Sequence, residues 1–575
     1  MKKMLSGNEA IARGAYEAGV SFAAAYPGTP STEILETVAQ EYPAIHAEWT
    51  PNEKVALEVA AGASYAGVRS MAVMKHVGVN VAADPLMTLP YTLIRGGLVL
   101  VSADDPELFS SQNEQDNQHY ARFAKIPMLE PSTSQEARDY TIEAFEISER
   151  FGTPVLLRTT TRISHSLGVV EEGTPRAPGT PSIERHPAEW VMLPANARVR
   201  HPVIEERILA LKALSNSSRL NTVELNDTSL GIISAGVAYQ YAREAFPNAS
   251  FLKLGMSYPL PDELIRDFAS KVDELWVVEE LDPFIEEQVR ALGIPCRGKD
   301  RLPLCGELNP DIVKSAVSGK AAQASQAPDL PARPPSMCPG CPHRSMLWAL
   351  KRNKCFIAGD IGCYTLGFLP PLSAIDTTLC MGAGINHAHG MATVFGPGKQ
   401  KIAAVIGDST FYHSGITGLL NLAYNKGAAL VVILDNSTTA MTGAQDHPGT
   451  GLTIRGDHTI SLDLEQLVKA LGIGWVRTVN PYEVKKARND IKEALAYGGP
   501  AVIISRAPCV LLKSRMVLGM ALKVDAEVCT GCKVCISLGC PAIEFRDEKA
   551  YINDMCVGCG VCAELCAAGA IGGEK

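Results

Sequence analysis

The stretch of sequence that decides the fold is 401–443, in which two apolar runs each lead into a polar turn. The first part reads KIAAVI followed by GDSTFYHSG (401–415), and the second reads AALVVIL followed by DNSTTAMTG (428–443). Short apolar runs that end in such turns are typical of buried parallel strands, and open α/β sheets bind ligands at those strand ends. We therefore expect a parallel-sheet α/β domain with a ligand site on these two turns.

Asp408 and Asn436 follow the two expected strands and lie 28 positions apart. Together they offer oxygen ligands for a hard cation such as Mg²⁺, which completes its octahedron with water and phosphate oxygens. The pair resembles the signature of thiamine diphosphate enzymes, in which GD(G/S) is followed by Asn about thirty residues later. This resemblance implies Mg²⁺ ligation by Asp408, Asn436 and the backbone carbonyl of Thr438, with Gly407 and Ser409 in the cofactor-binding turn. Two ordinary strand-end turns with Asx hydrogen bonds are the alternative.

Length and composition bound the class of protein. A chain of 575 residues with 46% hydrophobic residues predicts several domains with substantial cores. The chain contains no run of about 18 uncharged apolar residues, so we expect no membrane span. Charged residues interrupt any signal-peptide core at the N-terminus. A net charge of −9 gives no reason to expect nucleic-acid binding. In the cytoplasmic location that we therefore expect, 16 cysteines indicate metal sites rather than disulfides.

Residues 1–185 read as one α/β domain. FAAAYPGTPST (22–32) is a strand that runs into a turn, and it presents the hydroxyl of Thr29 at the strand's carboxyl end. NEKVALEVAAGASYAG (52–67) is a helix rich in alanine and glycine that opens with Glu53. Such small residues permit close approach of another element or of a cofactor.

These two segments resemble the pyrimidine-binding domain of 2-oxoacid:ferredoxin oxidoreductases. In that family a YP-x-TP turn precedes a Glu that opens an Ala/Gly-rich helix, with a Gly fourteen positions later, here Gly67. The resemblance implies that Glu53 hydrogen-bonds N1′ of the aminopyrimidine and that Thr29 belongs to the active site. For Glu58 we keep the plain interpretation of a carboxylate near a helix N-terminus, where the helix dipole favours it.

Two further polar residues follow an expected buried strand in GTPVLLRTTTRISHS (152–166). Arg162 and Ser164 could bind a carboxylate, the arginine through a bidentate fork. They could equally be surface residues at a strand end.

Residues 186–320 are expected to hold a connection and a smaller α/β unit. The strands and helices of 228–318 match in position the transketolase C-terminal-like second domain of the same enzymes, which the resemblance leaves without chemistry of its own. AAQASQAPDLPARPPS (321–336) is a low-complexity linker.

The third large domain, 337–519, contains the opening motif and begins with a C-x-x-C pair, Cys338 and Cys341. By resemblance to the same family, Cys363 in GDIGCYTLG and Cys509 in SRAPCVLL complete the ligands of a proximal [4Fe–4S] cluster. A structural zinc site or unpaired buried thiols are the alternatives.

MGAGINHAHG (381–390) resembles the glycine-rich turn and helix N-terminus that approach the diphosphate, a geometry suited to anions. On that resemblance Gly382 and Gly384 are cofactor-binding residues. We expect the nearby Cys380 to be a core cysteine.

Residues 520–575 contain two C-x-x-C-x-x-C runs, each with a distal cysteine. The spacing resembles the bacterial two-cluster ferredoxin, an α+β domain in which the fourth cysteine of each run binds the other cluster. The resemblance implies two [4Fe–4S] clusters, one held by Cys529, Cys532, Cys535 and Cys566, and the other by Cys556, Cys559, Cys562 and Cys540. Two departures, a four-residue gap before Cys540 and Ala567 in place of a proline, indicate a local loop change. A zinc module is the alternative.

The domain order and the stretches MKHVGVNVAADP, SSQNEQD, CPGCPHR and TTAMTGAQDHP resemble the large subunits of the arylpyruvate-oxidising branch of this family. The resemblance implies oxidative decarboxylation of arylpyruvates such as indole-3-pyruvate, transfer of the acyl group to coenzyme A, and delivery of electrons to an external ferredoxin. It also implies a separate small beta subunit, because no domain of that type occurs in this chain.

Two rival interpretations stay open. One is the same reaction on branched-chain or other 2-oxoacids. The other is an electron-transfer subunit with a vestigial thiamine site, against which the presence of Asp408, Asn436 and Glu53 argues.

Overall fold

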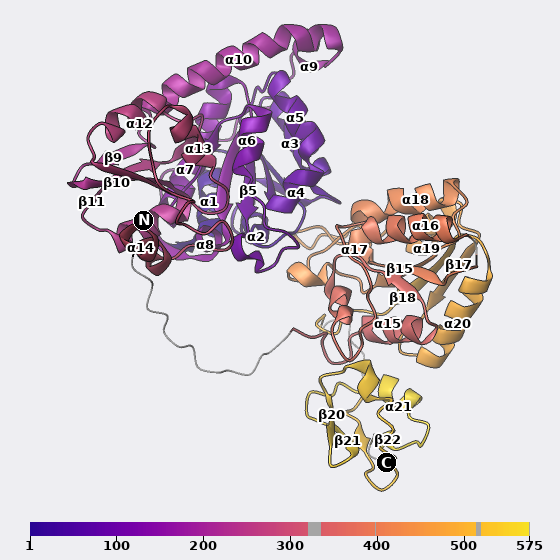
Figure 1. Ribbon diagram of the computed structural model, residues 1–575. Helices are drawn as coiled ribbons and strands as arrows, with labels where there is room; N and C mark the ends of the chain where they lie inside the picture. Colours follow the sequence, from indigo (N-terminus) through magenta and orange to yellow (C-terminus); the bar gives the residue numbers. More distant parts are fainter. Residues whose placement is uncertain (320–334, 397, 513–518, 574–575) are drawn as a thin grey trace. The chain divides into compact units, whose positions relative to one another are not determined.

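The computed structural model describes residues 1–319, 335–396, 398–512 and 519–573. The chain forms two compact units, Met1–Ala327 and Pro328–Lys575 (Figure 1). The expected linker at 321–336 lies outside the described residues except for its last two. Each unit is built around a parallel sheet, so the predicted α/β class is confirmed.

The larger sheet of the first unit has seven strands in the order β12-β6-β7-β5-β4-β2-β3. Only β12 and β6 pair antiparallel; every other pair is parallel. The central strands are buried on both faces, as expected for a parallel sheet covered by helices. The strands are β2 (Phe22–Ala25), β3 (His46–Trp49), β4 (Ser70–Lys75), β5 (Leu98–Asp104), β6 (Met128–Leu129), β7 (Val155–Thr160) and β12 (Met256–Tyr258).

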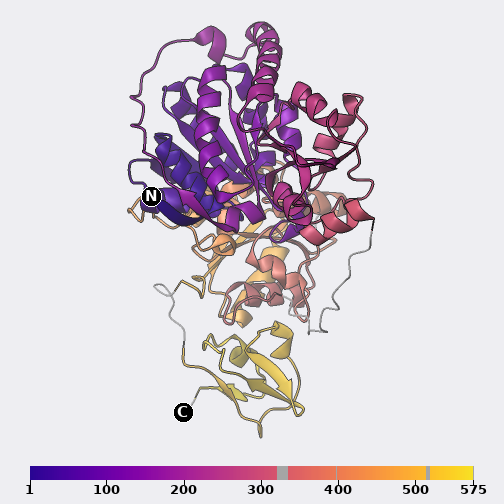
Figure 2. The ribbon, with the colours of Figure 1, turned by 90° about the vertical axis from the view of Figure 1, so that its left-hand side faces the viewer.

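Helices lie on both sides of this sheet (Figure 2). α1 begins at a capping box, because the Ser6 hydroxyl accepts from Glu9 N–H while the Glu9 carboxylate accepts from Ser6 N–H. Asn52 caps the N-terminus of α3, and Gly67, with φ +79°, follows its C-terminus in the left-handed conformation. A short antiparallel pair, β1 (Lys2–Ser6) and β8 (Leu167–Glu171), completes this part. The helices are α1 (Gly7–Glu17), α2 (Thr32–Glu41), α3 (Glu53–Tyr65), α4 (His76–Val81), α5 (Ala83–Thr88), α6 (Gln118–Ala124), α7 (Ser134–Phe151) and α8 (Thr161–His165).

The second sheet of this unit has the order β13-β10-β11-β9, with β9 antiparallel to β11. Strand β12, which follows β11 in sequence, pairs with β6 and joins the edge of the larger sheet. A 24-residue helix, α10, lies where we expected mainly a connection. The elements are α9 (Pro187–Trp190), α10 (Pro194–Ser217), β9 (Thr222–Glu224), β10 (Asp227–Ala235), α11 (Gly236–Ala245), β11 (Ala249–Leu254), α12 (Asp262–Ala269), β13 (Glu274–Val278), α13 (Phe284–Ala291) and α14 (Pro310–Ser318).

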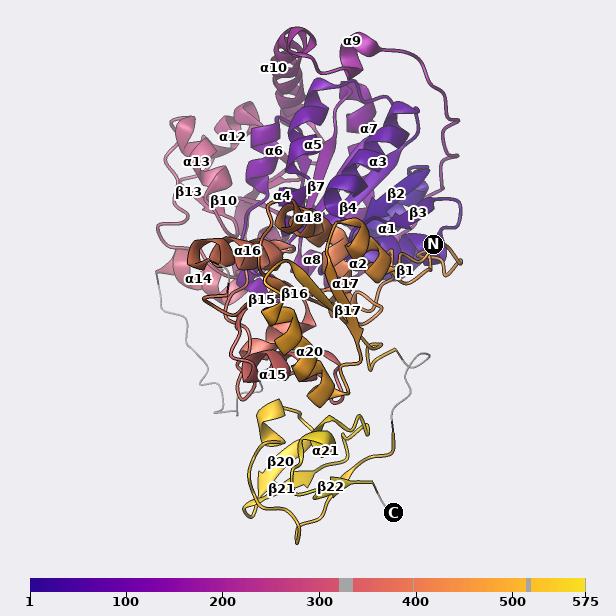
Figure 3. The same cartoon turned by 90° about the vertical axis from the view of Figure 1, so that its right-hand side faces the viewer.

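The second unit contains a five-stranded, all-parallel sheet with the order β14-β15-β16-β18-β17. The two apolar runs of the opening stretch are its neighbouring strands β15 and β16, as predicted. Helices α15 and α20 lie side by side, as do α16 and α18 (Figure 3). The elements are α15 (His343–Arg352), β14 (Phe356–Ala358), α16 (Ala383–Phe395), β15 (Ile402–Gly407), α17 (Asp408–Thr410), α18 (Ile416–Tyr424), β16 (Leu430–Asp435), α19 (Leu464–Ala470), β17 (Trp475–Val479), α20 (Val484–Ala496) and β18 (Ala501–Arg506).

A small cysteine-rich module follows in the same unit, made of β19 (Lys523–Val524), β20 (Ile543–Arg546), β21 (Lys549–Ile552), α21 (Val561–Leu565) and β22 (Ile571–Gly572). It packs against the ends of α15 and α20. The Trp348 indole donates to Ser537 Oγ at 2.9 Å, and the Glu564 carboxylate accepts from Val484 N–H at 2.8 Å and from Lys485 N–H at 3.0 Å. A carboxylate from the module therefore caps the N-terminus of α20.

Within the described ranges, no helix combines the length and the apolar composition needed to cross a membrane.

Candidate active site

Three oxygen atoms converge where β15 and β16 end. The side-chain oxygen of Asn436 lies 3.2 Å from Asp408 Oδ1 and 2.8 Å from the backbone oxygen of Thr438. All three residues are at least 94% buried. Oxygens at the corners of a magnesium octahedron lie about 2.9 Å apart, given bonds of about 2.0–2.1 Å. The donor set and its spacing therefore fit Mg²⁺.

The orientation of the Asn436 amide can be argued from its other end. Asn436 Nδ2 lies 3.3 Å from His343 Nε2, and burial lowers the pKa of His343 to about 4. The ring is therefore neutral at neutral pH, so its Nε2 can accept a hydrogen bond. If the Asn436 amide were turned over, its NH₂ group would donate to Asp408 Oδ1 and to the Thr438 carbonyl, which suits a site without a cation. The orientation described here instead directs three oxygens at one point, as a bound cation requires.

The second carboxylate oxygen of Asp408 is held by donors. Asp408 Oδ2 accepts from Ser437 N–H at 2.8 Å and from Asn436 N–H at 3.2 Å, and it lies 3.2 Å from His447 Nε2. Because His447 Nδ1 accepts from Gly449 N–H at 3.0 Å, Nε2 carries the ring proton and donates to Asp408. Burial alone would raise the pKa of Asp408, but His447 and the N–H donors outweigh it and lower that pKa.

The remaining residues of the predicted cofactor turn have contacts within the chain. Gly407 ends β15, and a Cβ at this position would lie 3.0 Å from the Tyr364 ring. The Ser409 N–H donates to Asp408 Oδ1 at 2.8 Å, and its hydroxyl accepts from Thr439 Oγ1 at 2.8 Å.

Gly382 and Gly384 lie at the N-terminus of α16, and their N–H groups donate to the Asp360 carboxylate at 2.9 and 2.8 Å. Burial raises the pKa of Asp360 to about 6, although these donors oppose the shift. Cβ atoms at the two glycines would lie 2.6 Å from Ser414 and 2.9 Å from Gly359, so tight packing favours glycine at both. That Gly382 and Gly384 contact a diphosphate stays a prediction. The diphosphate cannot bind to the N–H groups of these glycines while the Asp360 carboxylate accepts from them.

The four cysteines predicted for the proximal cluster gather beside this site. Burial raises the pKa of Cys363 to about 11, and the negative charges of Cys509 and Cys338 add to the shift. Burial likewise raises the pKa of Cys341 to about 12, with Cys363 and Cys338 contributing. The Cys509 N–H donates to the Asn436 carbonyl at 2.9 Å. The raised pKa values keep these thiols neutral, and their deprotonated forms would need a cation to stabilise them.

The C-terminal cysteines lie close to one another in the module, and their division into the two predicted sets stays a prediction. One small cavity is lined by Cys529, Cys532, Cys535 and Cys566, among other residues. Burial raises the pKa of Cys562 to about 12, and the neighbouring charges that add to this shift include those of Cys559, Cys540 and Cys556. Cys380, by contrast, is exposed, so our assignment of it to the core is wrong: it lies in the turn before α16 rather than under it.

In the first unit, Glu53 lies at the start of α3 and is 4% exposed. Its carboxylate packs on Gly78, where a Cβ would lie 2.7 Å from Glu53 Oε1. Half-buried Thr29 is in the turn after β2, and its carbonyl accepts from Ser110 Oγ at 3.3 Å. Both residues therefore lie beyond the carboxyl ends of parallel strands, where α/β sheets bind ligands.

Arg162 and Ser164 do not provide the carboxylate site that we considered for them. Exposed Arg162 donates to Glu307 Oε2 at 2.7 and 3.0 Å. Ser164 is fully buried, with its hydroxyl 3.2 Å from Thr159 Oγ1. The sequence could not show that these side chains already have partners inside the chain.

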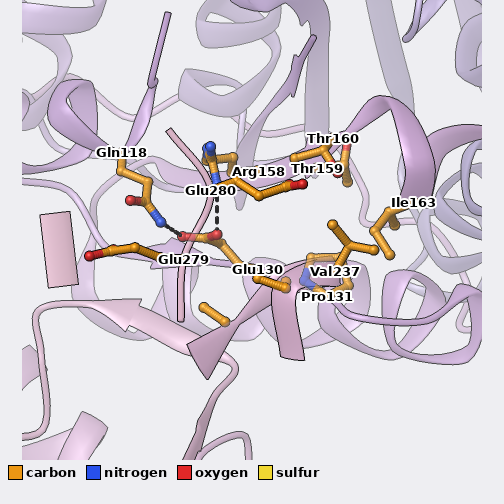
Figure 4. A pocket seen from close by; sticks show the side chains of 13 residues that line it. Gln118, Glu130, Pro131, Arg158, Thr159, Thr160, Ile163, Val237, Glu279 and Glu280 are labelled. Atoms are coloured by element: carbon orange, nitrogen blue, oxygen red, sulfur yellow. Dashed lines mark hydrogen bonds and ion pairs between the residues drawn. The ribbon is translucent and has the colours of Figure 1, made fainter. Parts of the chain in front are cut away.

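The arginine that faces the interior is Arg158, on β7. Its guanidinium lies 2.7 Å from Asp104, 2.8 Å from Glu130 and 3.3 Å from Asp116. Figure 4 shows Arg158 and Gln118 converging on Glu130 in a pocket that Glu279 and Glu280 also line. Burial raises the pKa of Glu279 to about 8 and that of Glu280 to about 7. We interpret this as a polar network that joins the two sheets of the unit.

Family models and curated relatives match most of this chain. A model described as "Pyruvate flavodoxin/ferredoxin oxidoreductase, thiamine diP-bdg" matches residues 13–205, and one described as "Thiamine pyrophosphate enzyme, C-terminal TPP binding domain" matches 360–505. The indolepyruvate oxidoreductase subunit IorA of Archaeoglobus fulgidus is 45% identical over 98% of this chain and 96% of its own length. That of Methanothermobacter thermautotrophicus is 44% identical over 99% of this chain and 97% of its own. A solved 2-oxoglutarate:ferredoxin oxidoreductase from Magnetococcus marinus aligns with a TM-score of 0.48 and 17% identity, covering 56% of this chain and 65% of that chain.

Proposed function

The chain belongs to the family of oxidoreductase large subunits that includes the indolepyruvate oxidoreductase subunits IorA, and from this membership we propose its reaction. The proposed reaction is oxidative decarboxylation of arylpyruvates, indole-3-pyruvate among them, with coenzyme A, to arylacetyl-CoA and CO₂. The electrons pass to an external ferredoxin. The observation that carries the proposal is the 45% identity over 98% of the chain.

Both thiamine-binding domains lie in this one chain. When bound, thiamine diphosphate stabilises the negative charge left by loss of CO₂, and iron–sulfur clusters carry single electrons. In the proposal, Asp408, Asn436 and Thr438 hold Mg²⁺ for the diphosphate, and Glu53 hydrogen-bonds the aminopyrimidine ring at N1′. Thr29, in the turn after β2, is the second catalytic residue of the proposal. Asp408, the Asn436 amide and the Thr438 carbonyl meet at one buried point, which argues against a vestigial site.

His447→Ala is expected to weaken Mg²⁺ affinity about 10- to 100-fold, because loss of an outer hydrogen-bond partner loosens a metal ligand. The measurement is the Mg²⁺ concentration that half-restores thiamine diphosphate binding after chelation. His458→Ala, at an exposed position in the same loop, is the control and should leave that concentration unchanged. An unaltered Mg²⁺ requirement in His447→Ala would show that His447 does not support Asp408.

The geometry of the cysteines supports iron–sulfur clusters over zinc. Among the described residues, no three cysteine sulfurs lie within 4.8 Å of one another. A tetrahedral zinc site with bonds of about 2.3 Å would place its sulfurs about 3.8 Å apart. In a [4Fe–4S] cluster each cysteine binds a different iron, which suits a wider spacing.

The electrostatic neighbours of the cysteines support an order for the three proposed sets. The negative charges of Cys559, Cys341 and Cys509 contribute to the raised pKa of Tyr482. The positive charge of Arg344 acts in turn on the pKa of Cys559. The set of Cys540, Cys556, Cys559 and Cys562 is therefore the one beside the proximal cysteines. The set that contains Cys566 is the outer one, and we propose that it faces the external ferredoxin.

Cys566→Ser is expected to change the same reduced-state electron paramagnetic resonance signal as Cys529→Ser, and a different signal from Cys556→Ser. The reason is the crossed pairing, in which the last cysteine of one run binds the cluster of the other. Iron content should fall by up to about four atoms per chain. Cys305→Ser, at an exposed position outside the motifs, should keep all its iron. Grouping of Cys566 with Cys556 would reject the crossed pairing.

The printed names of the relatives describe a subunit, which supports a small beta subunit as partner. The test of the function is anaerobic reduction of a low-potential dye by the chain together with that subunit. Indole-3-pyruvate, pyruvate and 2-oxoisovalerate are compared, each with and without coenzyme A. Coenzyme A-dependent reduction fastest with indole-3-pyruvate is expected. Preference for another 2-oxoacid would reject the substrate, and no reduction by any of them would reject the enzyme.

A further inference from the structure

Lys75 is the last residue of β4, and its side chain lies at the same edge of the sheet as Glu53 and Thr29. Its Cγ and Cδ atoms pack on Gly28, where a Cβ would lie 3.1 Å from each. The lysine stem therefore runs along the turn that carries Thr29. The sequence gives Lys75 no role of its own, because a lysine at a strand end is usually solvated.

The Lys75 ammonium has donors to spare. It donates to the Ser110 carbonyl at 3.1 Å, the one hydrogen bond that the described residues provide for its three N–H groups. Asp105 lies within electrostatic reach, but its carboxylate is already held by Ser110 N–H at 2.8 Å, Ser111 Oγ at 2.7 Å and Thr161 Oγ1 at 2.9 Å.

The loop over Lys75 is fixed by hydrogen bonds to the start of α4. The His76 carbonyl accepts from Gln115 Nε2 at 3.3 Å and from Asn117 Nδ2 at 3.1 Å, and His76 Nε2 lies 3.1 Å from the Asn113 carbonyl. The Lys75 ammonium donates to the Ser110 carbonyl of this loop, so it is anchored to a fixed segment at the strand ends. A preorganised cation of this kind binds an anion with little ordering cost.

A 2-oxoacid brings a carboxylate that needs a cationic partner once it leaves water. The two arginines on and just after β7, the second strand from β4 in the sheet, do not offer one. Arg158 lies among Asp104, Asp116 and Glu130, and Arg162 is paired with Glu307.

We propose that Lys75 is the cationic subsite that binds the carboxylate of the 2-oxoacid substrate. The assignment rests on the proposed function, and it deepens it by naming the residue that distinguishes a 2-oxoacid from the corresponding aldehyde or amide. Lys75 is then a binding residue for the group that is lost as CO₂, next to the turn that carries Thr29.

The charge of Lys75 should make substrate binding depend on pH. Burial lowers the pKa of Lys75 to about 8, although the charges of Asp105 and Glu53 oppose this shift. The adjacent His76 is fully buried, and burial and then the charge of Lys75 lower its pKa, so it adds no competing cation. As pH rises through about 8 the ammonium loses its proton, and affinity for the carboxylate should fall. Arginine stays protonated over this range, so Lys75→Arg should remove the alkaline loss.

The test uses the complete holoenzyme with inert ligands, so that it does not depend on turnover. Binding of indole-3-propionate and of its neutral amide is measured by calorimetry in wild type, Lys75→Met, Lys75→Arg and Lys54→Met. Lys54 is the matched control, because it lies on α3 and pairs with Glu58 at the surface.

We expect Lys75→Met to weaken the binding of indole-3-propionate about 10- to 100-fold, as for loss of a charged hydrogen-bond partner. The affinity for the neutral amide should stay unchanged. Lys75→Arg should retain carboxylate binding at pH 9, and Lys54→Met should match wild type. Equal losses for both ligands would assign Lys75 a structural role, and no loss in Lys75→Met would overturn the proposal. Carboxylate binding by the wild type is measured independently of turnover. A failure of the proposed reaction in the dye assay can therefore be told apart from a failure of the Lys75 assignment.

Discussion

Glu53→Gln is expected to lower the rate of 2-oxoacid-dependent dye reduction about 10²- to 10⁴-fold, the range for loss of a general acid–base group. The carboxylate is 4% exposed and lies against Gly78, so its position is fixed by the packing of α3 on α4. Glutamine retains the shape and can still hydrogen-bond, but it cannot share a proton with the aminopyrimidine ring. The measurement is turnover at saturating 2-oxoacid, together with the rate of hydrogen–deuterium exchange at C2 of the bound thiamine.

The matched control is Glu58→Gln, five residues further along the same helix. Glu58 pairs with Lys54 at the surface, so its loss should change turnover less than about twofold, because exposed pairs contribute little. Both variants should bind thiamine diphosphate and retain iron. If C2 exchange in Glu53→Gln were as fast as in wild type, Glu53 would not be the residue that activates the cofactor.

Arg158→Met is expected to destabilise the first unit by about 3–5 kcal/mol, the cost of removing one partner of a buried ion pair. Three carboxylates surround this guanidinium, and each is at most 6% exposed. Without the arginine they must be buried unpaired or become protonated. The measurement is the free energy of unfolding from anaerobic urea titration. Arg162→Met, which removes an exposed arginine paired with Glu307, should cost at most about 1 kcal/mol.

The pH dependence of this variant gives a second test. Even with Arg158 present, burial raises the pKa of Asp116 to about 6 and also raises that of Asp104. A carboxyl group whose pKa is higher in the folded state binds its proton there first, so stability falls as pH rises through that pKa. Removing Arg158 raises these values further, and the loss of stability should therefore shrink between about pH 7.5 and about pH 5.5. A loss that is the same at both values would mean that the carboxylates are not the cause.

The parts of the fold that the sequence predicts best are those set by local pattern. The strands before Asp408 and Asn436 are predicted because each is an apolar run that ends in a polar turn, and in the structure they are adjacent and parallel. The helix α10 is not predicted by the sequence, because the segment that leads into it is rich in proline, glycine and glutamate and indicates a connection. Pro202 also lies inside this helix, where prolines are rare.

The site residues that the sequence did not reveal depend on contacts between distant positions. His343 meets Asn436 across 93 residues and His447 meets Asp408 across 39, and neither spacing has a local signature. Arg158 and Arg162 lie four positions apart in one strand and turn, yet one faces the interior and the other solvent. The sequence left the role of Arg162 open and did not single out Arg158, because a strand-end residue cannot be assigned a partner before its neighbours in space are known. It overlooked Lys75 for the same reason.

Arg344 joins two cysteine motifs that lie far apart in the chain. One end of its guanidinium donates to the Met337 carbonyl at 2.7 Å, and the other donates to the Leu538 carbonyl at 3.0 Å. The first carbonyl precedes Cys338, and the second lies two residues before Cys540. Arg344 therefore fixes the C-terminal cysteine-rich module to the domain that holds Cys338 and Cys341. Electron transfer within the chain should then need no diffusion of the module, and only the encounter with the external ferredoxin should be limited by diffusion. A ferredoxin module from another protein placed at this position would need a carbonyl where Leu538 offers one to Arg344.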